Sequence, residues 1–403
     1  MAYMDLMHLF QGIGTLFMVD TKIAIARIVL MLLGIVLVFL GSKQILEPLI
    51  MIPLGFGMAA VNAGVLIMDA HTTGTIFLDP LVSETDALMN VLQIDFLQPI
   101  YTFTFSNGLI ACLIFLGIGV ITDLSFVLSY PFTSMLLALF AELGTFVVLP
   151  LGIAMGLTPG QAAAVSTIGG ADAPMVLFAS LQMSPELFVP ITVVAYLYLS
   201  LTYAGYPFLL RLLVPKELRG SIVKTTKRTN VTSKEKLIFA VFACTLLCFL
   251  IPIAAPLFSC LFLGIAIRES GILKYVNLLE NVVLYGASFF LAFLLGTLCD
   301  ARILLDPQVL PILVLGMLSL LISGIGGVIG GYVVYFINRK NFNPAIGMAG
   351  VSCVPTTAKI VQTEVAKANK RAIILQYAMG ASISGVITSA VIAGILITVH
   401  QLI

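Results

Sequence analysis

The sequence places an aspartate in a segment that is otherwise apolar. Asp172 follows two glycines and precedes Pro174 in TIGGADAPM, residues 167–175. An ionised carboxylate at the centre of a bilayer is costly, and such residues usually line the pathway of a substrate or an ion. Asp172 is therefore a candidate cation ligand. The simpler alternative is that it only caps the helix that follows.

The neighbours of Asp172 favour a break in a membrane helix. Glycine accepts positive φ and lets another backbone approach closely, and Pro174 suits the first turn of a new helix. We therefore expect Asp172 at the start of a half-helix. The unwound turn before it would expose carbonyl groups near Gly169 and Gly170, with the hydroxyl of Thr167 close by.

A second segment, NFNPAIGMAGVSCVPTTAKIV at residues 341–361, offers oxygen ligands of the same kind. Asn343 carries an amide oxygen, Ser352 carries a hydroxyl, and the carbonyl at Gly347 is open to approach. A hard cation such as Na⁺ prefers about five or six oxygen ligands, by extension from Ca²⁺ and Mg²⁺. Together the two segments predict a cation site between two broken helices.

Lys359 follows Ser352 by seven residues, which corresponds to two turns of a helix. If a helix begins after Pro355, one of its faces would carry both side chains. A lysine there could hold an anionic substrate. It could equally extend to the cytoplasmic membrane surface, and the sequence leaves both interpretations open.

The overall composition indicates where these segments lie. Of the 403 residues, 60% are hydrophobic and 10% are charged, and the mean hydropathy is +1.13, far from the values of a soluble domain. A span needs roughly 20 apolar residues, and about ten or eleven such stretches can be marked. The sequence thus predicts an all-α polytopic membrane protein, with whole helices near residues 24–41, 109–121, 131–157, 187–213, 236–258, 280–299, 309–336 and 372–399.

Three stretches are interrupted by Gly, Pro and small polar residues: 47–64, 158–180 and 341–361. Broken helices in lipid are tolerated only where protein or a water-filled cavity surrounds the free backbone groups. The segments at 158–180 and 341–361 occupy corresponding places in the two halves of the chain. Such pairs are typical of inverted repeats with a binding site near the middle of the membrane.

The distribution of charge suggests an orientation. There is no Lys or Arg between Lys43 and Arg211, whereas residues 216–236 carry seven cations against two acids. The positive-inside rule places this loop in the cytoplasm. The predicted organisation is an N-terminal surface helix at 1–22, a first membrane half at 23–215, the basic loop at 216–236 and a second half at 237–403.

Other conspicuous residues have structural explanations. The six cysteines and three histidines lack the spacing of a metal site or a disulfide framework, so we expect no metal other than Na⁺. The glycine cluster SGIGGVIGG at 323–331 predicts a close helix–helix contact. The charged pairs at 268–269 and 300–302 lie near segment ends, where they can pair or reach the membrane surface.

The sequence resembles a known family over almost its full length, the β subunits of Na⁺-translocating biotin-dependent decarboxylases. That family acts on oxaloacetate, glutaconyl-CoA, methylmalonyl-CoA or malonate. The resemblance is carried by LEPLIMIPLGFGMAAVNAG, STIGGADAP, SKEKLIF, IRESG and, most specifically, NFNPAIGMAGVSCVPTTAKIVQ. It implies a multi-pass subunit of the cytoplasmic membrane that decarboxylates carboxybiotin and exports Na⁺ while taking up a proton.

The resemblance also implies roles for single residues. The essential aspartate of the family matches Asp172, and its asparagine, glycine and serine match Asn343, Gly347 and Ser352. The resemblance thus implies a predicted Na⁺ site formed by these four residues. A functional tyrosine of the family falls on Tyr198 in VAYLYLS. The catalytic residues would then be Tyr198, Ser352 and Lys359, with Lys359 holding carboxybiotin. That position is usually arginine, and lysine keeps the charge but loses the bidentate grip on a carboxylate.

The family further implies partners. The sequence contains no Met-Lys-Met biotin-attachment motif and no carboxyltransferase domain, so biotin must arrive on another polypeptide. The expected partners are a biotin carrier protein, an α-type carboxyltransferase subunit and a small γ-type membrane subunit, together with further copies of the chain in a homo-oligomer. The alternatives are a Na⁺-coupled secondary transporter or Na⁺/H⁺ antiporter, which uses broken helices equally well, and a structural membrane subunit without turnover.

Overall fold

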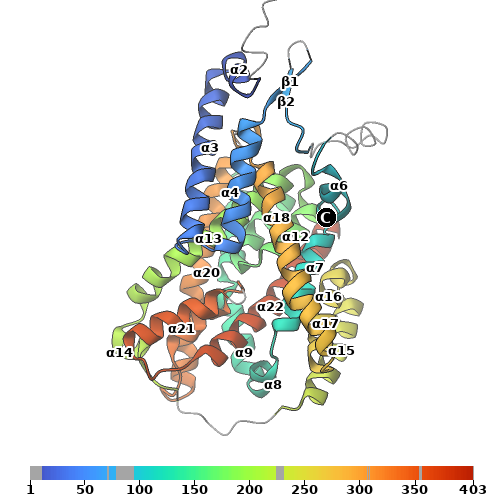
Figure 1. Cartoon of the computed structure of the whole chain (residues 1–403). Helices are drawn as coiled ribbons and strands as arrows, with labels where there is room; N and C mark the ends of the chain where they lie inside the picture. The colour runs from blue at the N-terminus through green and yellow to red at the C-terminus, as the bar shows by residue number, and fades with distance from the viewer. Residues whose placement is uncertain are drawn as a thin grey trace, which may run out of the picture. The chain divides into compact units, whose positions relative to one another are not determined.

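The computed structural model of the chain describes residues 11–69, 72–78, 95–223, 231–305, 307, 309–353 and 356–402. Apart from an antiparallel hairpin of β1 (Leu66–Asp69) and β2 (Thr72–Gly74), the elements of these ranges are helices (Figure 1). The predicted all-α class is confirmed. Most of residues 71–95 lie outside the described ranges.

The helices fall before and after the basic loop. Those before it are α2 (Gln11–Met18), α3 (Thr21–Ser42), α4 (Pro48–Ala63), α6 (Gln98–Ile100), η1 (Tyr101–Phe105), α7 (Leu109–Ile121), α8 (Ser125–Ser129), α9 (Pro131–Ala141), α10 (Leu143–Ala154), α11 (Pro159–Ser166), η2 (Thr167–Gly170), α12 (Ala173–Met183), η3 (Pro185–Leu187), α13 (Phe188–Leu213) and α14 (Lys216–Arg219). Those after it are α15 (Ser233–Leu250), η4 (Pro252–Ala254), α16 (Ala255–Glu269), α17 (Leu273–Leu278), η5 (Leu279–Val283), α18 (Leu284–Leu298), α19 (Ala301–Leu304), α20 (Val309–Ile337), η6 (Pro344–Gly350), α21 (Thr356–Ala368) and α22 (Leu375–Leu402).

The described ranges contain fewer long apolar helices than the roughly ten or eleven apolar stretches of the sequence. Within the described ranges, 6 helices are long and apolar enough to cross a membrane, or up to 8 if each bent pair of helices is one span. The two pairs bend by 64° between η1 and α7 and by 54° within α13. Two further apolar helices, α4 and α12, are shorter, with 16 and 11 residues. At 1.5 Å per residue they reach about 24 Å and about 16 Å, less than the hydrocarbon core of about 30 Å.

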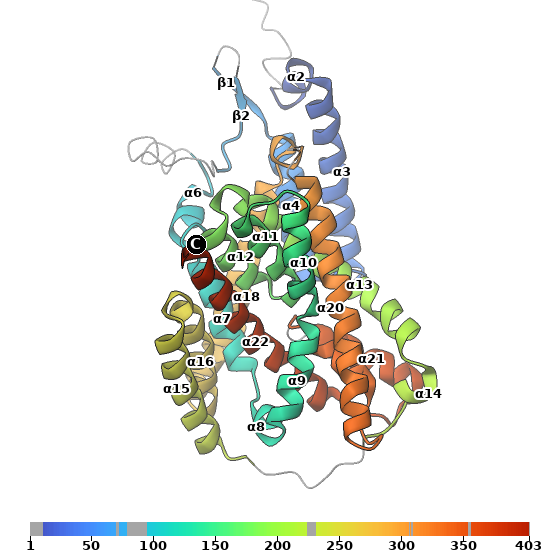
Figure 2. The same ribbon diagram turned by 180° about the vertical axis from the view of Figure 1, so that it is seen from behind.

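The predicted single span at 236–258 is wrong. Helix α15 ends at Leu250, Pro252 starts a short 3-10 turn, and α16 runs on to Glu269. The two helices pack against each other as a hairpin (Figure 2). Proline disfavours helical conformation in the residue before it and removes an amide donor, so the helix stops there even though the sequence stays apolar.

The predicted break at 47–64 is also wrong, because α4 is a continuous helix with Pro53 inside it. Its small residues serve packing. A Cβ atom on Gly55 would lie 2.5 Å from the carbonyl oxygen of Gly34 in α3, and one on Gly57 would lie 2.6 Å from that of Phe293 in α18. Helices α3 and α4 accordingly lie side by side (Figure 1).

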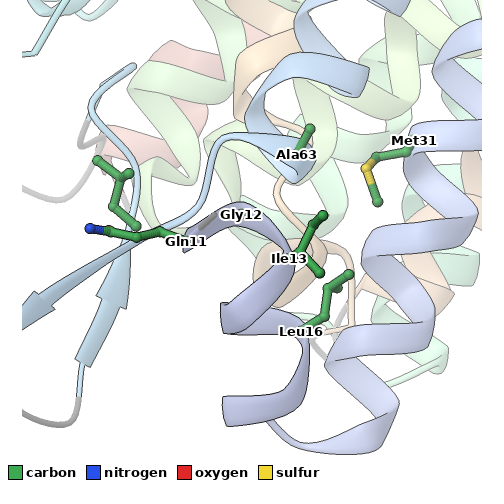
Figure 3. Close-up of a pocket in the computed structure, with 7 residues that line it drawn as sticks. Gln11, Gly12, Ile13, Leu16, Met31 and Ala63 are labelled. Carbon is green, nitrogen blue, oxygen red and sulfur yellow. The ribbon is translucent and has the colours of Figure 1, made fainter. Parts of the chain in front are cut away.

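The chain divides into two compact units. The first comprises the described residues up to Ile110 together with Gly286–Leu310, and the second comprises Ala111–Tyr285 and Pro311–Ile403. In the first unit, the buried Arg27 of α3 ties α2 to α4, donating to the carbonyl oxygens of Asn62 at 3.0 Å and Gly12 at 3.3 Å. An open pocket beside α2, lined by Gly12, Ile13 and Met31 among others, belongs to this unit (Figure 3).

The second unit contains the predicted functional segments. Helices α10, α11 and α12 lie together, and η2 contacts α10 and α22, while η6 packs on α9, α21 and α22 (Figure 2). The glycine cluster of α20 makes the predicted close contact, because a Cβ atom on Gly327 would lie 2.6 Å from the carbonyl oxygen of Gly347. A Cβ atom on Gly331 would collide with the carbonyl of Pro344. The expectation of close packing at residues 323–331 is therefore confirmed.

Candidate functional site

The predicted break before Asp172 is present. Helix α11 ends at Ser166, η2 follows, and Ala171 takes the left-handed conformation with φ of 53° before Asp172 occupies the N-cap position of α12. Pro174 lies in the first turn of α12, as expected. The positive φ was expected at one of the glycines, but it falls on Ala171.

The two glycines of the break are needed for close approach. A Cβ atom on Gly170 would lie 2.7 Å from Ser389 Oγ and 3.0 Å from Glu142 Oε1. One on Gly169 would lie 2.5 Å from Ser319 Oγ. Any larger side chain would therefore push apart three helices that meet at this turn, α10, α20 and α22.

Asp172 is a buried carboxylate with unused hydrogen-bonding capacity. The residue is 3% exposed, and its Oδ2 atom has no hydrogen-bond partner in the described part of the chain. The carboxylate faces the amide of Met175 without forming a capping hydrogen bond. Buried polar atoms are nearly always paired, so an orphaned oxygen points to a missing ligand. Capping of α12 does not explain why Oδ2 is buried without a hydrogen-bond partner among the described residues.

Tyr196 is a second buried group with an unpaired polar atom. It is 2% exposed, its hydroxyl has no partner among the residues described, and it interacts electrostatically with Asp172. The sequence interpretation chose Tyr198 instead. The hydroxyl of Tyr198 donates to the carbonyl of Leu313 in α20 at 2.7 Å, so this tyrosine ties α13 to α20.

Ser352 brings the two broken segments together. Its backbone N–H donates to the carbonyl oxygen of Gly170 at 3.1 Å, and its hydroxyl donates to the same oxygen. The residue is buried. Segments that lie 182 residues apart in the sequence thus meet two residues before Asp172.

Asn343 lies at the opposite end of η6 from Ser352. Its Oδ1 accepts from the amide of Ala345 at 3.0 Å, and its Nδ2 donates to the carbonyls of Arg219 at 2.9 Å and Ser221 at 3.0 Å. Seven residues of 3-10 helix, at about 2 Å each, separate the two ends of η6 by about 14 Å. Asn343 therefore anchors the second segment to the start of the basic loop.

Gly347 lies in the middle of η6 and packs on α20. A Cβ atom there would collide with the carbonyl of Gly327 and lie 2.5 Å from the amide nitrogen of Gly331. The structure thus groups Asp172 with Ser352, and it places Asn343 and Gly347 where they hold η6 in position.

Lys359 and Ser352 do not share a helix face. Ser352 lies before α21, which begins at Thr356. The prediction that both side chains lie on one face of a helix is therefore wrong. Ser352 is buried, whereas Lys359 is exposed on α21. The neighbouring Val354 and Pro355 lie outside the described residues.

Glu142 is a site residue that the sequence interpretation missed. It separates α9 from α10 inside one long span, Pro131–Ala154, and is 2% exposed. Its Oε2 accepts from the hydroxyl of Thr145 at 2.8 Å, and its Oε1 is hydrogen-bonded to the hydroxyl of Ser389 in α22. The sequence could have identified Glu142, because it is an acidic residue inside the apolar stretch 131–157. A charged side chain is costly in a membrane segment, and the same reason identified Asp172.

The arrangement offers oxygen atoms to a small hard cation. Two carboxylates, the Gly170 carbonyl and three hydroxyls gather where η2, α10, α22 and the end of η6 meet. The residues described include no group of three or more His, Cys, Asp or Glu side chains that could hold a metal ion. Oxygen ligands with few charges suit a monovalent hard cation or a proton.

Comparison with known proteins agrees with this chemistry. The model of the Na⁺-transporting oxaloacetate decarboxylase beta subunit family matches residues 26–400. The chain is 56% identical over 394 residues to a carboxybiotin decarboxylase of Malonomonas rubra, with 98% of each chain covered. It is 32% identical over 384 residues to a methylmalonyl-CoA decarboxylase subunit beta of Propionigenium modestum, covering 92% of this chain and 94% of the relative.

A relative from Haemophilus ducreyi, an oxaloacetate decarboxylase beta chain, is 29% identical over 436 residues and covers 98% of both chains. The match to the family model, over residues 26–400, includes both broken segments. A multi-pass membrane chain with this site and these relatives belongs to the family of Na⁺-transporting oxaloacetate decarboxylase beta subunits.

Proposed function

We propose that this chain is the membrane subunit that decarboxylates carboxybiotin and couples the reaction to Na⁺ export across the cytoplasmic membrane, with uptake of a proton. The observation that carries the proposal is the buried Asp172 Oδ2 atom, which has no hydrogen-bond partner among the described residues, two residues after the contact between Gly170 and Ser352. Family membership and the 56% identical carboxybiotin decarboxylase support the reaction class. The substrate is biotin-linked and is supplied by a partner.

The cation would be held mainly by the first broken segment. Asp172 supplies the negative charge, and the carbonyl of Gly170 and the hydroxyl of Ser352 supply neutral oxygens. Asn343 and Gly347 act by fixing η6, through the start of the basic loop and through α20 respectively. All four residues of the predicted Na⁺ site then matter for Na⁺ binding. Asp172 and Ser352 act as ligands, and the other two act by holding η6 in position.

Lys359 would bind the carboxylate of carboxybiotin. Its exposed ammonium group lies near the start of α21 and attracts the carboxylate of the substrate as a point charge. Helix α21 is fixed by a bidentate pair between Glu364 and Arg211 of α13, at 2.7 and 2.8 Å. This attachment fixes the helix that carries Lys359, although lysine lacks the bidentate guanidinium group of arginine.

The reaction consumes one proton. The bond between the biotin nitrogen and the carboxyl carbon breaks, its electron pair stays on nitrogen, and a proton added there gives biotin and CO₂. Tyr198 and Ser352 are the proposed proton relay of this step. Every change of protonation near Asp172 alters the affinity for Na⁺, so the chemistry can favour one of the two orientations of the site over the other.

The partners are part of the proposal. Biotin would arrive on a biotin carrier protein that an α-type carboxyltransferase subunit loads, and a small γ-type subunit would bind the chain within the membrane. Several copies of the chain would assemble as a homo-oligomer. Family membership supports partner subunits in general.

The test is CO₂ release from free carboxybiotin as a function of Na⁺ concentration, using the purified chain with its γ-type subunit. We expect saturable, Na⁺-dependent release. Asp172→Asn removes the charge at nearly constant volume, so it should abolish the Na⁺-dependent release while the protein stays inserted and monodisperse. Wild-type activity in Asp172→Asn would refute the assigned site. Absence of release from folded wild-type protein would favour a Na⁺-coupled transporter or antiporter.

A further inference from the structure

A row of hydroxyl groups connects Glu142 with the broken segment that carries Asp172. Glu142 Oε1 is hydrogen-bonded to the hydroxyl of Ser389. Ser389 Oγ lies 3.1 Å from Ser352 Oγ, and the hydroxyl of Ser352 reaches the carbonyl oxygen of Gly170. Four groups from four segments thus form one continuous row.

The number of protons in this row sets the charge of Glu142. The Gly170 carbonyl can only accept, so it takes the single proton of Ser352. The contact between the two serine hydroxyls then needs the proton of Ser389. Ser389 has no second proton for Glu142, and its contact with Oε1 is satisfied only if Glu142 itself carries a proton and donates it. The complete row requires Glu142 as a neutral carboxylic acid.

Ionised Glu142 would leave the row one proton short. Ser389 would turn its proton to the carboxylate, and the oxygens of Ser389 and Ser352 would face each other at 3.1 Å with no proton between them. Facing lone pairs repel each other, but they are a suitable pair of ligands for a cation. The same atoms therefore form two arrangements. In one, Glu142 is protonated and the row of hydrogen bonds is complete; in the other, Glu142 is ionised and the two serine oxygens can bind a cation.

The surroundings of Glu142 supply no other compensation for its charge. Asp172 interacts with it electrostatically, and Tyr196 in turn interacts electrostatically with Asp172 and Cys353. The neighbouring helices contribute hydroxyls: Thr145 from α10, Ser323 and Ser319 from α20 and Ser389 from α22. None of the ion pairs in the described ranges involves Glu142 or Asp172.

Two neighbouring carboxylates without a cationic side chain cannot both be ionised in a dry site unless a cation joins them. We propose that Glu142 is the proton-binding group of the cation site, neutral when the site holds no cation and ionised when Na⁺ is bound between Asp172 and Ser352. This inference rests on the Na⁺ site of the proposed function. Na⁺ enters as one proton leaves Glu142, so the charge of the site stays constant.

The test measures protons released when Na⁺ binds to the purified complex. Titration calorimetry in two buffers of different ionisation enthalpy gives both the dissociation constant and the protons released. We expect about one proton per Na⁺ in the wild type, and a Kd for Na⁺ that falls about tenfold for each unit of rising pH, as linkage requires for one exchanged proton.

Glu142→Gln mimics the protonated acid. Its amide can donate to Ser389 and accept from Thr145, so the row of hydroxyls survives without a releasable proton. We expect weaker Na⁺ binding, no proton release and a Kd that no longer changes with pH. Glu142→Asp should restore proton release. Glu280→Gln, the same change at an acid of another apolar span, should behave like the wild type.

The outcomes separate this inference from the proposed function. Wild-type protein that binds no Na⁺ would end both. Na⁺ binding without proton release, or full release from Glu142→Gln, would overturn the role of Glu142 and leave the Na⁺ site standing. If Glu142→Gln does not fold, infrared difference spectra of the wild type decide. Addition of Na⁺ must then remove the band of a protonated carboxyl group, and an unchanged band refutes the proposal.

Discussion

Among the described residues, neither Asp172 nor Glu142 forms an ion pair, in contrast to three acids nearer the ends of their segments. Asp123 pairs with Lys236 at 2.8 Å, Glu364 with Arg211 at 2.7 Å and Asp300 with Arg302 at 3.1 Å. These pairs lie near the ends of their segments, where the sequence predicted pairing for Asp300. A buried charge is normally paired, hydrogen-bonded or neutralised by a ligand or a proton. We therefore propose a functional explanation for the two inner acids, whereas ion pairing explains the outer ones.

Gly170 offers a test at the scale of one atom. Gly170→Ala would place a methyl group 2.7 Å from Ser389 Oγ and 3.0 Å from Glu142 Oε1. Overpacking of this kind costs about 1–3 kcal/mol. We expect a lower melting temperature and loss of Na⁺-dependent CO₂ release.

Gly205→Ala is the matched control for this change, because a Cβ atom there meets nothing within 4 Å. Replacing a helical glycine with alanine at such a position favours the helix by up to about 1 kcal/mol. Equal effects of the two substitutions on the Na⁺ dependence would show that close packing at Gly170 is not required for the site.

At the scale of elements, one buried acid attaches α21 to α13. Glu364 is buried and accepts two hydrogen bonds from Arg211 of α13, and Lys367 donates to its Oε1 at 2.6 Å. The hydrogen bond from Arg211, with that from Lys367, outweighs burial and holds the pKa of Glu364 below its usual value. Lys359 lies five residues earlier on α21, so this attachment helps to fix its position.

Glu364→Gln tests that attachment. The amide cannot accept from Arg211 and Lys367 as an anion does, and we expect a loss of about 1–3 kcal/mol in stability. Arg211 is half exposed, which favours the lower end of this range. We further expect weaker binding of carboxybiotin with unchanged Na⁺ affinity. Substrate and Na⁺ affinities that fall together would contradict a role confined to α21.

The same pair predicts a pH dependence. A carboxyl group with a lowered folded-state pKa contributes stability that is complete above its unfolded pKa, near 4.5 for Glu364. That contribution is lost as the pH falls through the lowered folded-state pKa. Thermal unfolding of the wild type should thus become more acid-sensitive below about pH 4.5 than that of Glu364→Gln.

At the scale of the whole molecule, the exposed apolar side chains mark the surface that meets lipid. Helix α3 exposes Ile25, Leu32 and Phe39, and α15 exposes Phe242 and Phe249. Large exposed apolar surfaces of this kind are foreign to soluble monomers. Charged side chains gather instead at the basic loop and the helix ends beside it.

The orientation of the chain in the membrane remains a prediction with a direct test. Lys234 is exposed in the first turn of α15, next to the basic loop. Lys234→Cys should react with a membrane-impermeant thiol reagent in inside-out vesicles and stay protected in right-side-out vesicles. The unmodified chain, with its six cysteines, gives the background. Labelling only in right-side-out vesicles would reverse the predicted orientation.

The sequence alone determined the features that depend on neighbouring residues. Its hydropathy determined the membrane class, and glycines next to a proline determined the break before Asp172. The motif at 341–361 indicated a second break with Ser352 in it. Such features follow from local backbone preferences and from the cost of charge in lipid, which can be read along the chain.

Only the tertiary structure decided which residues meet. Glu142 and Ser389 lie 247 residues apart, and their contact follows from the packing of α22 against η2 and η6. The same packing places Asn343 at the far end of η6, away from Ser352. Small residues looked alike in the sequence, yet they break a helix at 167–172 and pack a continuous helix in α4. A glycine permits both outcomes, and the partner surface that selects one of them is formed by distant segments.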